Sequence, residues 1–138
     1  MPILWHLSIA CCLTPSFHKS SYKITFDEEI RSVFYSEDYI GVVQETGDPE
    51  RKYKISAYDT DGDKKFQEYI EFEYDNIYCT NKEIIVTGGT NCKIFRTNGT
   101  VKFSAELSDK IVGMVPNGKY HEYIVVYNNK TEVIKIKL

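Results

Sequence analysis

A sequence repeat constrains the fold of this chain more than any other feature. Residues 58–62 (YDTDG) return as residues 95–99 (FRTNG), so that their final glycines are 37 residues apart. Phe66 and Phe103, which follow these glycines, are also 37 residues apart. Self-similarity at such a period is typical of proteins in which one supersecondary unit is repeated along the chain.

The N-terminal part of the first copy is seven residues longer than that of the second. Ile40 of the first copy corresponds to Ile84 of the second, 44 residues later, whereas Gly62 corresponds to Gly99, 37 residues later. The additional residues fall between Gln44 and Lys54, where the turn-forming sequence of residues 47–49 (GDP) occurs. We therefore predict a loop at this place, because loops tolerate insertions.

Each copy reads as four short strands that are rich in β-branched and aromatic residues and separated by turn residues. In the second copy we expect them at residues 74–79, 83–87, 92–96 and 101–107. The Asp-Gly and Asn-Gly pairs before the fourth strands predict type I′ hairpin turns, which need positive φ at both central residues. Four antiparallel strands about every 40 residues predict an all-β fold of about three propeller-like blades, a partial β-propeller. A β-sandwich is the alternative, although it does not require an internal repeat.

The repeat domain is expected over residues 21–138, with blades at about residues 30–72, 73–109 and 110–138. The third copy ends with its third strand. Residues 21–27 are expected as a lone strand, because they align with the fourth strand of the first copy. Closed rings hold about 4 to 8 blades. Three blades therefore leave open a fragment of a larger propeller, an assembly of several copies, or an open stack.

Residues 1–20 form an irregular and mostly apolar N-terminal segment. Its apolar run, residues 2–13, is shorter than the ~20 residues that cross a bilayer. No Lys or Arg precedes this run, as a signal peptide would require. Three interpretations stay open: the remnant of a membrane anchor, a strand of its own, or a leader that does not belong to the fold.

The charge balance argues against a nucleic-acid partner. The chain has 17 Lys and Arg against 20 Asp and Glu, a net charge of −3. Nucleic-acid binding depends on a positive field that neutralises phosphates, and no basic run supplies one locally. We therefore expect no nucleic-acid partner.

Several strand and turn motifs resemble those of a known group of proteins. They are residues 34–43 (FYSEDYIGVV), 58–62 (YDTDG), 73–77 (EYDNI) and 91–95 (NCKIF). Over about residues 21–138 the chain resembles the C-terminal part of an uncharacterised bacterial family, a domain of unknown function. Its members resemble β-propellers tethered by one N-terminal membrane helix. The resemblance implies an extracytoplasmic, membrane-associated protein and supplies no catalytic residues.

The acidic residues offer two candidate sites, and we interpret both as structural. Asp59, Asp61 and Asp63 suggest a calcium loop, but their glycine does not stand where an EF-hand loop requires it, and the second copy has no carboxylate there. The clusters at residues 27–29 and 71–75 could act as paired acids. They align with each other in the repeat, which favours a solvated rim. We predict no metal site, no cofactor and no catalytic residues.

Histidines, cysteines and tyrosines are likewise interpreted as structural. We expect His6, His18 and His121 at the surface. Cys79 and Cys92 could form a disulfide, but both align with apolar strand positions of the first copy, which favours free thiols. The 11 tyrosines could form a binding face, although tyrosine is also a good strand residue.

The predicted function is that of a non-catalytic interaction module, not an enzyme, with a protein or a glycan as ligand. The first alternative is a fragment of a larger propeller enzyme or sensor whose active site lies in missing blades. The second is a truncated gene product without a function of its own. Because the end blades of an incomplete ring expose apolar faces and strand edges, we also predict self-association through open blade edges.

Overall fold

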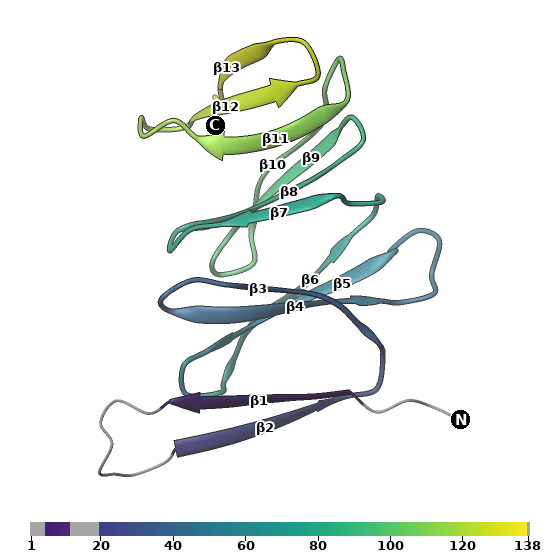
Figure 1. Cartoon of the computed structure of the whole chain (residues 1–138), viewed down its shortest axis with the longest axis vertical. Coiled ribbons are helices and arrows are strands. Elements are labelled where there is room, and N and C mark those ends of the chain that lie inside the picture. The colour runs from purple at the N-terminus through teal and green to yellow at the C-terminus, as the bar shows by residue number, and fades with distance from the viewer. Residues whose placement is uncertain (1–4, 12–19, 138) are drawn as a thin grey trace. The chain divides into compact units, whose positions relative to one another are not determined.

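The computed structural model describes residues 5–11 and 20–137, and all the regular structure in these residues is β-strand. The chain divides into two compact units, residues 1–69 and 70–138. The described part of the chain offers no helix with the length and hydropathy that a membrane span needs. The strands form four antiparallel sheets, two with four strands, one with three and one with two (Figure 1). This confirms the predicted all-β fold of propeller-like, four-stranded repeats.

The first unit contains the two-stranded sheet and the first four-stranded sheet, in the order β3-β4-β5-β6. Its strands are β1 (Trp5–Cys11), β2 (Ser20–Phe26), β3 (Ile30–Tyr35), β4 (Tyr39–Glu45), β5 (Tyr53–Asp59) and β6 (Lys64–Ile70). The central strands β4 and β5 are buried along most of their length, because both of their faces are covered. Strands buried on both faces have near-continuous apolar sequences, as β4 and β5 do.

The strand expected to stand alone at residues 21–27 has a partner. β2 pairs with β1 in a continuous antiparallel register from Trp5 opposite Phe26 to Cys11 opposite Ser20. Phe26 is buried and meets Tyr58 of β5 edge to face, with ring centroids 6.1 Å apart. A strand needs partners for its backbone N–H and C=O groups, and β1 supplies them. Sequence alignment of β2 with β6 could not reveal this partner, because pairing is a property of the tertiary fold.

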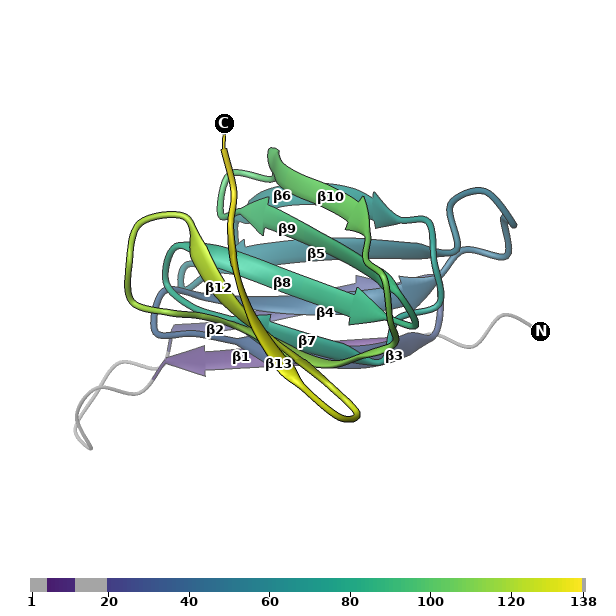
Figure 2. The same ribbon diagram turned by 90° about the horizontal axis from the view of Figure 1, so that it is seen from above.

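The second unit contains the sheet β10-β9-β8-β7 and the three-stranded sheet β11-β12-β13. Figure 2 shows β7 to β10 side by side in chain order. The strands are β7 (Asn76–Cys79), β8 (Glu83–Gly88), β9 (Asn91–Arg96), β10 (Val101–Glu106), β11 (Ile111–Pro116), β12 (Glu122–Tyr127) and β13 (Thr131–Lys135). The two sheets share one apolar core that includes Ile85, Ile94, Met114 and Val125.

The turns before the fourth strands differ from the predicted type I′. Gly62 has φ 85° and Gly99 has φ 91°, but neither of the residues before them has positive φ. Gly62 N donates to the Asp59 carbonyl at 3.1 Å, and Gly99 N donates to the Arg96 carbonyl at 2.9 Å. These are type I turns completed by a left-handed glycine, the three-residue hairpin loop. The type I′ prediction is wrong because such a loop needs positive φ only at the glycine.

The seven-residue difference between the copies lies in the loop between β4 and β5, as predicted. β4 ends at Glu45 and β5 begins at Tyr53. Thr46 N donates to the Lys52 carbonyl at 3.1 Å, so the loop is closed at its base. Asp48 N donates to Thr46 Oγ1 at 3.0 Å. In the second copy β8 and β9 are joined directly at residues 89–90.

Cys79 and Cys92 form no disulfide with each other, as predicted. Cys92 is fully buried in the core of the second unit, and this burial raises its pKa to about 11. Cys79 lies on β7 opposite Ile84, whereas Cys92 lies on β9 opposite Thr87. The two thiols are therefore on strands separated by β8, and Cys92 behaves as a small apolar core residue.

Candidate functional site

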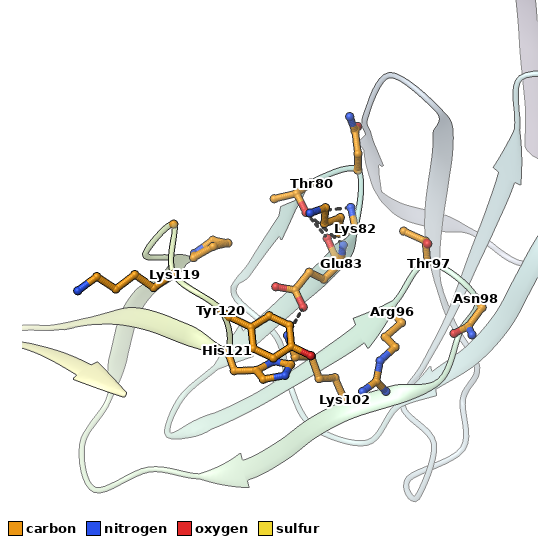
Figure 3. A pocket seen from close by; sticks show the side chains of 13 residues that line it. Thr80, Lys82, Glu83, Arg96, Thr97, Asn98, Lys102, Lys119, Tyr120 and His121 are labelled. Carbon is orange, nitrogen blue, oxygen red and sulfur yellow. Dashed lines mark hydrogen bonds and ion pairs between the residues drawn. The ribbon is translucent and has the colours of Figure 1, made fainter. Parts of the chain in front are cut away.

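A cleft of about 980 Å³ opens on the second unit, and we call it the cationic cleft after the lysines and the arginine in its lining. Three turns line it: the one before β8, the one between β9 and β10, and the one between β11 and β12 (Figure 3). Its lining residues are Thr80, Asn81, Lys82, Glu83, Arg96, Thr97, Asn98, Lys102, Pro116, Gly118, Lys119, Tyr120 and His121.

The first wall is the turn between β7 and β8. Thr80 N donates to the Glu83 carbonyl at 2.9 Å. Thr80 Oγ1 accepts hydrogen bonds at 3.1 Å from the backbone N–H groups of Lys82 and Glu83. A threonine hydroxyl that bonds to the backbone of the following residues is a common way to fix a turn. The turn thereby presents Lys82 at the cleft.

The second wall is the turn from Arg96 to Thr100. Arg96 N donates to the Thr100 carbonyl at 2.8 Å. Asn98 Oδ1 accepts from the Thr100 backbone N–H at 3.0 Å and from the Thr100 hydroxyl at 2.7 Å. The oxygen of the Asn98 amide is thus used within the turn, while its NH₂ group keeps its donors.

The third wall is the loop that joins β11 to β12. Asn117 N donates to the Glu122 carbonyl at 3.0 Å, and Asn117 Nδ2 donates to Glu122 Oε2 at 3.1 Å. Two residues of this loop have positive φ, Gly118 at 81° and His121 at 59°. Between them the loop carries Lys119 and Tyr120, and Tyr120 is 82% exposed.

Beside the cleft, Glu83 and Lys102 of its lining form a polar triad with the buried Tyr123, and the side chains of Lys102 and Glu83 are 9% and 14% exposed. Lys102 Nζ lies 2.9 Å from Glu83 Oε2 and donates to Tyr123 Oη at 2.7 Å. Tyr123 Oη donates to Glu83 Oε1 at 2.6 Å. Burial raises the pKa of Tyr123 well above its ordinary value, and the hydrogen bond to Glu83 raises it further. Each member has a partner, as buried polar networks require.

The remaining cations give the cleft its positive charge. Lys102 is neutralised by Glu83, the one carboxylate in the lining. Within residues 20–137, Lys82, Arg96 and Lys119 take part in no ion pair. An anionic group is the natural ligand of such a surface, because guanidinium and ammonium groups bind carboxylate and phosphate through charge-assisted hydrogen bonds.

His121 is unusual in both its backbone and its side chain. In the described part of the chain it is the one residue other than glycine with positive φ. Its Nδ1 is buried and has no hydrogen-bond partner, while its ring lies under that of Tyr120, with centroids 3.5 Å apart. Desolvation lowers the pKa of His121, and the positive charges of Lys102 and Arg96 lower it further.

The calcium-loop candidate forms a hydrogen-bonded turn. Asp59 Oδ1 accepts hydrogen bonds at 2.9 Å from the backbone N–H groups of Asp61 and Asp63. This carboxylate therefore fixes its own turn, in the manner of aspartates at turn starts. The turn lies in the first unit and is the counterpart of the second wall of the cationic cleft.

The acidic clusters engage lysines and backbone groups within their own units. Glu28 Oε1 lies 3.4 Å from Lys54 Nζ. Both carboxylate oxygens of Glu71 lie 2.8 Å from Lys93 Nζ. Asp75 Oδ2 accepts from the Gly89 backbone N–H at 3.1 Å. None of these carboxylates lines the cationic cleft.

Among the residues that the structure describes, His121 is the histidine that lines the cleft. His6 lies on β1, where the structure describes the backbone, and His18 lies outside the described residues. Most described tyrosines pack in the cores of the sheets, which favours their role as strand residues. The buried ones are Tyr39, Tyr53, Tyr58, Tyr74, Tyr123 and Tyr127.

Sequence reasoning did not single out Lys82, Arg96 and Lys119 as a site. These cations come from three turns and meet only in the folded unit. One signal was present: the segment from Pro116 to Glu122 is longer than its counterparts in the other copies. A lengthened loop is a frequent place for binding residues.

A comparison with protein-family models identifies the family of the chain. A model described as a family of unknown function (DUF5711) matches residues 14–136. The chain belongs to this family. This DUF5711 chain matches no curated protein.

Among solved structures, the DUF5711 chain is similar to one entitled "Crystal structure of HIRA(644-1017)". The TM-score is 0.61 at 10% sequence identity. The likeness covers 96% of this chain and 50% of that one, so this chain spans about half of its length. At such low identity the likeness concerns the fold alone, and it agrees with the propeller-like sheets described above.

Proposed function

We propose that this DUF5711 chain is a non-catalytic binding module that holds its ligand in the cationic cleft. The observation that carries this proposal is that Lys82, Arg96 and Lys119 are held by three separate turns without an ion pair in the described part of the chain. Unpaired charges that line one concave surface favour a ligand of the opposite sign.

The chemistry of the cleft supports binding without conversion of the ligand. General acid–base catalysis needs a group that exchanges a proton near the working pH, and His121, the imidazole of the lining, has a buried Nδ1 and lies against the ring of Tyr120. The carboxylate of Glu83 is committed to Lys102 and Tyr123, and the pKa of Tyr123 is raised far above neutrality. A second carboxylate, as glycoside hydrolysis commonly uses, is absent from the lining.

The test is a binding screen with the purified full chain on printed glycans and peptides. We expect bound ligands to be lost in the variant Lys82→Ala/Lys119→Ala, and to be recovered chemically unchanged by mass spectrometry. Lys110→Ala is the matched control, because Lys110 is exposed on the same unit but does not line the cleft. Binding that survives the double variant, or a ligand that is cleaved, would overturn the proposal.

The resemblance of the strand motifs to a membrane-tethered bacterial family supports a location for this module. We propose that it acts outside the cytoplasm at a bacterial surface. Fractionation of cells that produce the natural protein should recover it with the membranes and should show it to be digested by protease added to intact cells. Recovery in the cytosol, protected from protease, would contradict this location and leave the binding role untouched.

A further inference from the structure

The cationic cleft offers more to its ligand than charge. The guanidinium of Arg96 has one side-chain hydrogen bond, a long contact of 3.4 Å from Nη1 to Thr100 Oγ1. The planar fork of arginine matches the two oxygens of a carboxylate. Lys119 stands on the neighbouring loop and adds a second cation (Figure 3). One carboxylate could therefore be held by Arg96 while a second charge meets Lys119.

Uncharged polar groups surround these cations. The side chains of Asn81 and Thr97 line the cleft and form no hydrogen bond with the described residues, and Asn98 has a free NH₂ group. Amides and hydroxyls both donate and accept. A ligand rich in hydroxyl groups could satisfy all of them at once.

Tyr120 gives the cleft an aromatic wall. Its ring is 82% exposed and lies against the ring of His121. An aromatic ring with a polar end suits interfaces that are apolar on one side and wet on the other. The C–H face of a sugar ring has this character.

The cleft has few of the features that hold a peptide. None of its lining residues is Leu, Ile, Val, Met or Phe, the usual apolar anchors of a peptide pocket. Of the strands at its walls, β8, β9 and β12 are paired on both sides, whereas β10 and β11, which carry Lys102 and Pro116, are edge strands of their sheets.

The backbone of His121 points to selection for a role in binding. A residue other than glycine at φ 59° has a strained backbone, and such residues gather at ligand sites. The strained backbone places the His121 ring, with its unpartnered Nδ1, beneath Tyr120. A glycine there would relieve the strain and remove the ring.

On the basis of the proposed binding role, we infer that the ligand of the cationic cleft is an acidic carbohydrate, a sugar chain that carries carboxylate groups. Arg96 and Lys119 would hold the carboxylates, Asn81 and Thr97 the hydroxyl groups, and Tyr120 the face of a sugar ring.

Calorimetric titration of the full chain tests this inference. The probes are oligosaccharides of galacturonate, of mannuronate and guluronate, and of hyaluronan, each with a carboxyl-reduced neutral counterpart. Hexaglutamate, oligothymidylate and inorganic phosphate complete the set. We expect at least one acidic oligosaccharide to bind about tenfold or more tightly than its neutral counterpart and than the other anions.

Two variants assign the contacts. Arg96→Gln should weaken the acidic oligosaccharide about tenfold or more, because a charge-assisted pair is lost. Tyr120→Ser should weaken it severalfold and leave phosphate binding unchanged. Lys110→Ala should bind as the unaltered chain does, and thermal melts show whether each variant is folded. Lys119→Gln, on the exposed loop, replaces Arg96→Gln if that variant does not fold.

Each outcome decides between the two proposals. Tighter binding of hexaglutamate or oligothymidylate at the cleft would overturn the carbohydrate inference and preserve the binding role. Equal binding of phosphate and sugar, with no effect of Tyr120→Ser, would leave only a charge site and overturn it as well. If no acidic oligosaccharide binds, the carbohydrate inference fails. If the glycan and peptide screen also finds no cleft-dependent ligand, the binding role fails with it.

Discussion

In the sheet β3–β6 the last turn begins at Asp59, whereas in the sheet β7–β10 the equivalent turn begins at Arg96. The backbones of the two turns agree closely. Asp59 N donates to the Asp63 carbonyl at 2.9 Å, and Arg96 N donates to the Thr100 carbonyl at 2.8 Å. The facing residues on the neighbouring strands are Tyr39 in the first sheet and Glu83 in the second.

The same lysine position shows how the two sheets differ in chemistry. Lys65 is exposed and lies 5.4 Å from the centroid of the Tyr39 ring. The side chain of its counterpart Lys102 is 9% exposed and paired with Glu83. A repeat fixes the backbone and the core, but leaves the residues at the ends of its strands free to diverge. At this place the second sheet carries residues of the cationic cleft, whereas the first sheet carries Asp59, whose carboxylate is hydrogen-bonded within its own turn.

The largest expected difference concerns these two lysines. Lys102→Met should lower the free energy of unfolding by about 3–5 kcal/mol, because it leaves the carboxylate of Glu83 buried without its cation. Lys65→Met should cost about 1 kcal/mol or less, since it removes only an exposed cation–π contact. Urea unfolding of both variants measures the difference, and equal costs would contradict the contrast between the sheets.

A smaller effect is expected at the ends of β4 and β8. In the first sheet Gln44 has room for a side chain, which donates from Nε2 to the Glu28 carbonyl at 3.0 Å. At the equivalent Gly88 an added Cβ would lie 1.9 Å from the backbone oxygen of Glu73. Gly88→Ala should cost about 2–3 kcal/mol through overpacking against backbone.

Gly113→Ala is the control for this prediction, because nothing lies within 4 Å of a Cβ at Gly113. Its free energy of unfolding should stay within about 0.5 kcal/mol of that of the unaltered chain. Thermal or urea unfolding measures both variants. A Gly88→Ala variant as stable as Gly113→Ala would show that Gly88 is not tightly packed against the backbone of Glu73.

The pH dependence of stability should reveal the electrostatics of the cationic cleft. The groups that act on His121 are Lys102, Arg96 and Lys135, which lower its pKa together with desolvation, and Glu83, which opposes them. Since the pKa of His121 is lower in the folded than in the unfolded chain, its contribution to stability is complete above the unfolded value of 6.5. It is lost as the pH falls from 6.5 through the folded value.

His121→Asn tests this prediction, because asparagine tolerates positive φ and does not titrate. Urea unfolding at pH 7.5 and pH 5.0 should show a smaller loss of stability on acidification in the variant than in the unaltered chain. His6 and His18 are common to both proteins and cancel in the comparison. An identical loss in the two would contradict the assignment.

The weakest expected effect is association through an open strand edge. β13 is an edge strand of the three-stranded sheet, and its residue Val133 is 58% exposed. Unpaired edges invite strands of other molecules, and a charged side chain discourages them. Light scattering after size exclusion should show concentration-dependent oligomers of the unaltered chain and fewer of Val133→Lys. A monomer at every concentration would contradict this prediction.

Much of the fold could be predicted because its signals are local. The strands of the second copy begin and end within about two residues of the predicted positions, since hydrophobic alternation and turn residues act over a few residues. The turn glycines were located correctly, although their turn type was not. The partner of β2 was not found, because pairing between strands is settled by the fold as a whole.

The sequence by itself determined the repeat, the all-β class, the place of the inserted loop and the apolar character of Cys92. Each of these follows from the spacing or the type of residues near one another in the chain. Only the tertiary structure decided that Lys82, Arg96 and Lys119 share one cleft and that Lys102 is buried against Glu83 and Tyr123. The physical reason is that charge acts through distances in space, and antiparallel sheets bring together turns that lie far apart along the chain.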